Sequence, residues 1–118
     1  MTLKECYDQM HGSFDDAKSR LMMESMVERF MFRFLEDGTM DTLRTAVAAG
    51  NIPESFRAAH TLKGVAANLA FTELQRKASD LTEQLRPQTA PADPALVNEV
   101  EKAYSLVVDT IHAYQSAK

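Results

Sequence analysis

Apolar residues recur at intervals of three and four along most of this chain, and no segment alternates apolar and polar residues as a strand does. The spacing predicts helices over residues 2–10, 21–36, 39–49, 51–69, 72–86 and 94–114, with a short helical turn after Ser13. Gly38 interrupts the first long helix. We therefore expect an all-α protein, an antiparallel four-helix bundle with short additional N-terminal helices.

The expected helices begin at recognisable signals. Asn51 is a good cap for the helix that contains His60, and Asp93 is a good cap for the last helix. Thr72 and Gln75 have the spacing of a capping box, in which each residue caps the backbone of the other. These signals predict where the helices of the bundle start.

One domain accounts for the whole chain. Its 118 residues, 45% of them hydrophobic, supply a single core. We divide the domain 1–118 into a short N-terminal helical segment, 1–20, and a helical bundle, 21–118. The clearest loop, 87–94, holds three of the four prolines but is too short to separate two domains.

The segment 21–36 concentrates large apolar residues at helical spacing. Its apolar positions are Met23, Met26, Val27, Phe30, Met31, Phe34 and Leu35. We expect this helix to lie at the centre of the core, because Met and Phe at helical spacing are usually buried. The alternative is that its methionines form an adaptable recognition surface, since thioethers adjust to irregular partners.

Charge and composition argue against several classes of protein. The net charge of −4 is opposite to that of a general nucleic-acid binder. The chain has no run of about 18 apolar residues to span a membrane, and its start lacks the apolar core of a signal peptide. The single cysteine, Cys6, cannot form an internal disulfide. We expect a cytoplasmic monomer that binds neither nucleic acid nor membrane.

The stretch 57–69 contains the main candidate functional residues. At about 100° per residue its apolar side chains gather on one face, and His60 points away from that face. Lys63 and Gly64 lie one turn further along on the side of His60, and Ala67 extends this patch of small residues. A glycine inside a helix costs ~1 kcal/mol relative to alanine. Gly64 therefore indicates that space is needed beside the imidazole.

These residues resemble the histidine phosphotransfer (Hpt) domain family, whose signature is a helical His-x-Leu-Lys-Gly, then small residues and Leu-Gly. The chain matches over residues 60–69, as HTLKG followed by VAANL. It departs at Ala70, where the signature has its second glycine. The resemblance implies a helical bundle of about this length. It also implies that His60 accepts a phosphoryl group and exchanges it with an aspartate on a receiver domain.

The resemblance also implies partners and cofactors. The partners are a response-regulator receiver domain, a hybrid sensor kinase or both, and the receiver supplies the acidic pocket and magnesium. No cofactor is expected on this chain. The sequence contains neither a P-loop nor the glycine-rich nucleotide site of a kinase. We therefore expect a phosphoryl carrier in a two-component phosphorelay, not an enzyme that phosphorylates itself from ATP.

Histidine has the chemistry that this role requires. It is mostly neutral at cytoplasmic pH, with a lone pair available, and it can carry a covalent group as a nucleophile. The ammonium of Lys63 would offset the charge of a phosphoryl group on His60. Gly64 would let a partner protein approach the imidazole closely. We expect Arg57 and Ala67 to belong to the same docking surface.

Two residues of the following helix are further candidates. Antiparallel packing across the turn near Phe71 places Thr82 opposite His60, because each lies eleven positions from that turn. As in members of the family that carry a polar partner there, Thr82 would hold one ring nitrogen, and Arg86 would lie near the phosphate. The alternative for both is a solvated polar residue on an exposed face.

Other candidate sites are weaker. His11 and His112 lie far from His60 in sequence, and no His-x-x-x-His or Cys-x-x-Cys spacing is present, so we expect no metal site. The alternative function is a helical protein-interaction or scaffold domain, in which His60 is only a surface residue. The donor kinase, the acceptor receiver, the direction of phosphoryl flow and the pathway output stay open, as does whether the chain is part of a larger kinase.

Overall fold

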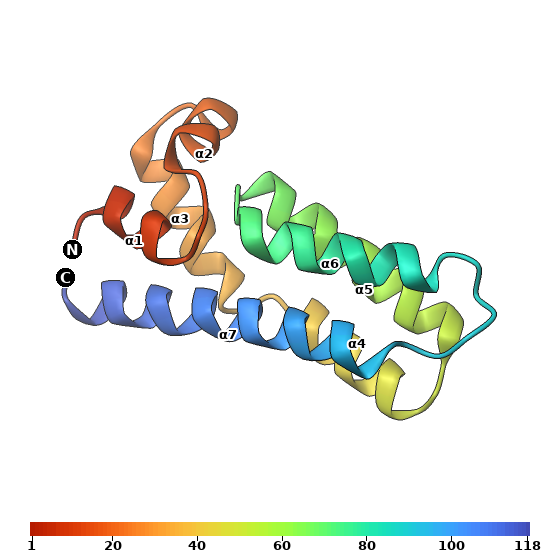
Figure 1. The fold of residues 1–118 in the computed structure, drawn as a ribbon. Coiled ribbons are helices and arrows are strands. Elements are labelled where there is room, and N and C mark those ends of the chain that lie inside the picture. Colours follow the sequence, from red (N-terminus) through yellow and green to blue (C-terminus); the bar gives the residue numbers. More distant parts are fainter.

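The computed structural model describes all 118 residues, as seven helices and no strand (Figure 1). The helices are α1 (Leu3–Gln9), α2 (Phe14–Leu21), α3 (Glu24–Phe34), α4 (Thr39–Ala48), α5 (Ile52–Asn68), α6 (Thr72–Leu85) and α7 (Pro94–Ser116). None of them combines the length and the apolar composition that crossing a membrane requires. The prediction of an all-α protein is confirmed.

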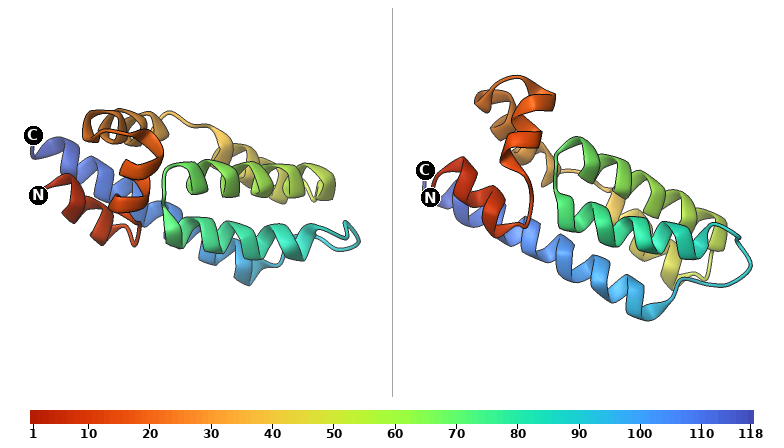
Figure 2. Two further views of the ribbon diagram at one scale, coloured as in Figure 1. Left: turned by 90° about the horizontal axis from the view of Figure 1, so that it is seen from above. Right: turned by 45° about the horizontal axis from the view of Figure 1, so that its top comes forward.

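The main helices pack as an antiparallel bundle. α5 and α6 lie side by side, α4 packs on α5, and α7 packs on α6 and runs the length of the molecule (Figures 1 and 2). α3 leads into α4, and residues 35–38 interrupt the two as Gly38 predicted. α1 and α2 pack against α7 and α3 at the end of the bundle where the termini lie. The predicted bundle with short additional helices is therefore confirmed.

The core joins the N-terminal segment to the bundle. The largest fully buried side chains are Tyr7, Phe34, Phe71, Met10, Met31, Met40, Leu43, Leu62, Leu74, Leu81, Leu85 and Ile111. The Phe71 ring lies 5.1 Å from the Phe34 ring and 5.8 Å from the Tyr7 ring, measured between centroids. Because Tyr7 belongs to α1 and Phe34 to α3, this aromatic cluster holds both to the α5–α6 turn.

The predicted helix over 21–36 is shorter than expected. α2 continues to Leu21, and the chain then turns at Met22, whose φ of 76° is incompatible with a helix. α3 therefore begins only at Glu24 and ends at Phe34. The expectation that Met23 faces the core is wrong, because this residue is 54% exposed, whereas Val27 and Met31 are buried.

The caps of the helices are only partly as predicted. The Asn51 side chain accepts a hydrogen bond from the backbone of Glu54, and Asp93 caps α7 in the same way. The capping box at Thr72 is wrong, because Phe71 occupies the N-cap position of α6 and provides no side-chain cap. Phe71 is fully buried, so the demands of the core decide how this helix begins.

The turn between α5 and α6 is held by the N-terminal segment. The Tyr7 hydroxyl donates to the Leu69 carbonyl over 2.9 Å, and the Ser13 amide donates to the Ala70 carbonyl over 3.0 Å. In the opposite direction, the Glu73 amide donates to the His11 carbonyl over 3.1 Å. These bonds fix the C-terminal end of the helix that carries His60.

Candidate functional site

His60 lies near the middle of α5 with its side chain exposed. The opposite face of α5 is buried, through Ser55, Ala58, Ala59, Leu62 and Ala66. Small residues dominate this buried face, so α5 packs closely against its neighbours while the imidazole stays in solvent. His60 thus points outward, as the sequence predicted.

No large side chain projects from α5 at Gly64, beside His60. A side chain at Gly64 would point into open space, with no atom within 4 Å of its Cβ. Ala67 is half-buried, and Arg57 is exposed and pairs with Glu54 over 3.1 Å. Gly64, Arg57 and Ala67 thus form one accessible patch on α5 around the imidazole.

Thr82 does not lie as predicted. Its side chain is fully buried, and its hydroxyl donates to the Ala78 carbonyl over 2.7 Å. Residue 82 falls four positions after Ala78 and three before Leu85, on the inward stripe of α6. The expectation that Thr82 holds a ring nitrogen of His60 is therefore corrected, and so is the alternative of a solvated residue.

Arg86 is exposed and anchored from two sides. Its guanidinium pairs with the Glu83 carboxylate at 2.6 Å and lies over the Phe56 ring, 5.4 Å from the centroid. The pKa of the Glu83 carboxyl lies below its usual value, chiefly because Arg86 donates hydrogen bonds to it. The nearby charge of Lys63 lowers this pKa further. Lys63, Arg86 and Glu83 therefore all lie near the imidazole.

The sequence reasoning missed Phe56 and Glu83. The Phe56 ring stacks on the His60 imidazole, with centroids 6.1 Å apart and planes 29° apart. A signal was present, because residues four apart on a helix lie on the same side. Glu83 carried no such signal, since its place beside His60 depends on how α6 packs against α5.

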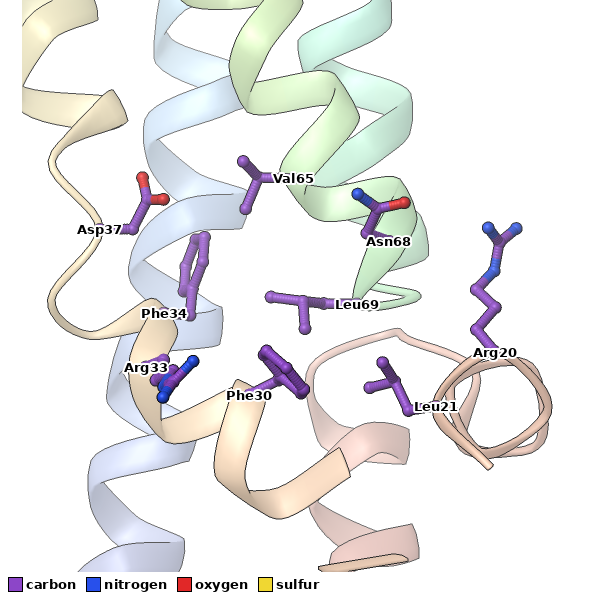
Figure 3. Close-up of a pocket in the computed structure, with 9 residues that line it drawn as sticks. All are labelled: Arg20, Leu21, Phe30, Arg33, Phe34, Asp37, Val65, Asn68 and Leu69. Atoms are coloured by element: carbon purple, nitrogen blue, oxygen red, sulfur yellow. The ribbon is translucent and has the colours of Figure 1, made fainter. Parts of the chain in front are cut away.

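An open groove lies elsewhere on α5. Figure 3 shows this groove of about 420 Å³, where Phe30, Phe34 and Leu69 form an apolar floor and Val65 and Asn68 line it from α5. Neither His60 nor Lys63 lines it. No group of His, Cys, Asp and Glu side chains is placed to hold a metal ion. The imidazole thus stands on an open helical face, where chemistry depends on what approaches it.

The chain matches the model of one protein family. The Hpt domain family model matches residues 25–110, a range that includes all of α5 and α6. Comparison with curated proteins and with solved structures gives no match. α1 and α2 precede the matched range, which covers well over half of the chain and contains His60, Lys63 and Gly64. The chain belongs to the Hpt domain family.

Proposed function

We propose that this chain is a phosphoryl carrier that accepts a phosphoryl group on His60 and exchanges it with the aspartate of a receiver domain. The observation that carries the proposal is the exposed imidazole beside Gly64, above which the chain leaves open space. The membership in the Hpt domain family supports the same function.

Gly64 supports a protein partner in particular. Nothing within the chain needs a glycine there, because a Cβ would meet no atom within 4 Å. The absence of a side chain therefore matters only to something that approaches from outside. A small substrate would be enclosed in a concave site, whereas His60 is exposed on a helix. We infer that a receiver domain docks over the patch formed by His60, Gly64, Arg57 and Ala67.

The transfer step requires little from this chain. The lone pair of a neutral imidazole nitrogen attacks the phosphorus of the phosphoaspartate, a P–N bond forms, and the P–O bond to the carboxylate breaks. The carboxylate leaves with the electron pair, and the ring keeps the proton on its other nitrogen until solvent takes it. Lys63 and Arg86 offset the added phosphoryl charge. We further propose that the receiver supplies magnesium and the acidic pocket. The phosphorelay would be cytoplasmic, and the partners would be a receiver domain, a hybrid sensor kinase or both.

Incubation with a phosphorylated receiver domain tests the proposal. The wild-type chain should gain an acid-labile, base-stable phosphoryl label, and His60→Gln should gain none. His112→Gln and His11→Asn are the controls and should keep the label, because both side chains are exposed and Asn tolerates the positive φ at residue 11. A label that persists in His60→Gln contradicts the assignment. No label on the wild type favours the interaction or scaffold domain instead.

A further inference from the structure

Phe56 joins the imidazole to a cation of the neighbouring helix. Its ring stacks on His60 with the centroids 6.1 Å apart, and the Arg86 guanidinium lies over the same ring at 5.4 Å. His60 and Phe56 belong to α5, whereas Arg86 directly follows α6. The half-buried Phe56 ring thus contacts both the imidazole and the guanidinium.

No hydrogen bond restrains the imidazole in the structure. The hydroxyl of Thr82, the polar side chain expected there, donates to the Ala78 carbonyl instead. Stacking on Phe56 is therefore the aromatic contact that orients the His60 ring. Orientation matters because a ring nitrogen must point at the incoming phosphorus, and a misplaced reacting group slows transfer strongly.

Arg86 also contacts the Phe56 ring. Its guanidinium is held in place by two contacts. It donates hydrogen bonds of 2.6 and 2.9 Å to the Glu83 carboxylate, and it lies on the phenyl ring. Cation–π contacts of this kind favour one ring position over others. One continuous series of contacts therefore leads from α6 to the imidazole, through Glu83, Arg86, Phe56 and His60.

We propose that Phe56 is a positioning residue for phosphotransfer: its ring fixes the orientation of the His60 imidazole and links it to Arg86. Phe56 makes and breaks no bond in the reaction. The inference rests on the proposed function, since it concerns the same imidazole. It assigns the orientation of the ring to stacking, where a hydrogen-bonding partner on α6 was expected.

Two substitutions and two measurements test the inference. Phe56→Leu keeps an apolar side chain but removes the ring, and Phe56→Tyr keeps the ring. In single-turnover transfer from a phosphorylated receiver, Phe56→Leu should lower the maximal rate about two- to tenfold, the effect of losing one aromatic pair. The half-saturating receiver concentration should change less than the rate. Phe56→Tyr should restore the wild-type rate to within about twofold.

The second measurement does not depend on phosphotransfer. Nuclear magnetic resonance of the unphosphorylated chain reports the ring protons of His60, identified by their loss in His60→Gln. The ring-current shift caused by Phe56 should disappear in Phe56→Leu and remain in Phe56→Tyr. Phe32→Leu is the matched control, because Phe32 also lies between a ring, Tyr114 at 6.0 Å, and a cation, Lys118 at 6.0 Å, but near the C-terminal end of α7. It should leave both readouts unchanged.

The outcomes separate this inference from the proposed function. Unchanged His60 resonances in Phe56→Leu, or a maximal rate equal to that of the wild type, would overturn the positioning role. An equal loss of rate in Phe32→Leu would overturn it too, because the effect would then be one of general stability. If the wild type itself takes no label, the proposed function fails and the positioning role with it, and the resonances then show whether the stack itself was assigned correctly.

Discussion

Two cationic side chains flank His60, and their surroundings differ. Arg86 is already paired with Glu83 at 2.6 Å and lies on Phe56. Lys63 is half-buried one turn after His60 and makes no ion pair, although its charge acts on the Glu83 carboxyl. Of the two, Lys63 is therefore the cation that can turn to a phosphoryl group without first breaking an ion pair.

Replacing Lys63 should have a modest effect on phosphotransfer. A phosphoryl group adds between one and two negative charges, and an exposed ion pair contributes about 0.2–1 kcal/mol in water, somewhat more where docking excludes solvent. Lys63→Ala should therefore slow transfer or shorten the lifetime of the phosphohistidine by roughly 2- to 10-fold, and Lys63→Arg should keep most of the rate. Label is measured on samples stopped at intervals, with circular dichroism to check the fold. Complete loss of label in a folded Lys63→Ala would mean a direct chemical role, and no change would mean a solvated surface residue.

Two substitutions of Gly64 test stability and docking separately. Because a Cβ there meets nothing within 4 Å, Gly64→Ala should stabilise the chain by up to ~1 kcal/mol through helix propensity. Gly64→Glu should fold equally well but block transfer, since its bulk and charge would stand where we propose that the receiver docks. Urea unfolding and transfer kinetics measure the two effects. If receiver binding survives in Gly64→Glu undiminished, the docking surface lies elsewhere.

At the scale of helices, periodicity predicted the bundle well because packing decides most helical positions. The inward face of α5 and the stripe of α6 are both buried as the spacing indicated. Periodicity failed where the backbone changes direction between apolar residues. Met23 belongs to the predicted apolar face, but the positive φ of Met22 ends α2 and leaves both methionines exposed.

The site was predictable only along one helix. His60, Lys63 and Gly64 share α5, so their spacing alone placed them together. Contacts between helices depend on side-chain choices that the sequence does not reveal. Thr82 is a polar residue that the core accepts, because its hydroxyl bonds to a carbonyl one turn earlier on its own helix. Glu83, one residue later, is exposed and pairs with Arg86 beside the imidazole instead.

Ala70 shows why the family signature has a glycine after Leu69. Its φ is 57°, in the left-handed region that favours glycine, and its methyl group is almost fully buried. Ala70→Gly should change the free energy of unfolding by less than about 1 kcal/mol, because relief of backbone strain and loss of a buried methyl oppose each other. Ala70→Val should destabilise by about 1–3 kcal/mol, since a β-branched residue fits neither this φ nor the space. Urea unfolding compares the two, and equal stabilities would contradict the strain argument.

At the scale of the whole molecule, the segment before the family match acts on the part that contains the site. α1 and α2 precede residue 25, where the match begins. Yet Tyr7 and Ser13 bond to the carbonyls that end α5, and Tyr7 packs on Phe71 in the aromatic cluster. The N-terminal segment is therefore structurally part of the bundle, and the turn after the His60 helix depends on it.

Gly12 lies close to the turn between α5 and α6. A Cβ on Gly12 would lie 2.7 Å from the Ala70 carbonyl oxygen and 3.0 Å from the Tyr7 ring, and the carbonyl cannot move aside without breaking its bond to the Ser13 amide. Gly12→Ala should therefore destabilise the chain by about 1–3 kcal/mol. Gly38→Ala is the matched control, because its Cβ would meet nothing within 4 Å, and as an N-cap change it should cost less than about 1 kcal/mol.

Denaturant unfolding of both variants, followed by circular dichroism, measures this difference. Because His60 lies well before the turn on α5, the folded fraction of Gly12→Ala should still take the phosphoryl label at nearly the wild-type rate. Two variants of equal stability would show that the N-terminal segment can separate from the turn at no cost. A stable Gly12→Ala that no longer takes label would mean instead that the segment shapes the docking surface directly, since only the position of α5 and not its stability would then have changed.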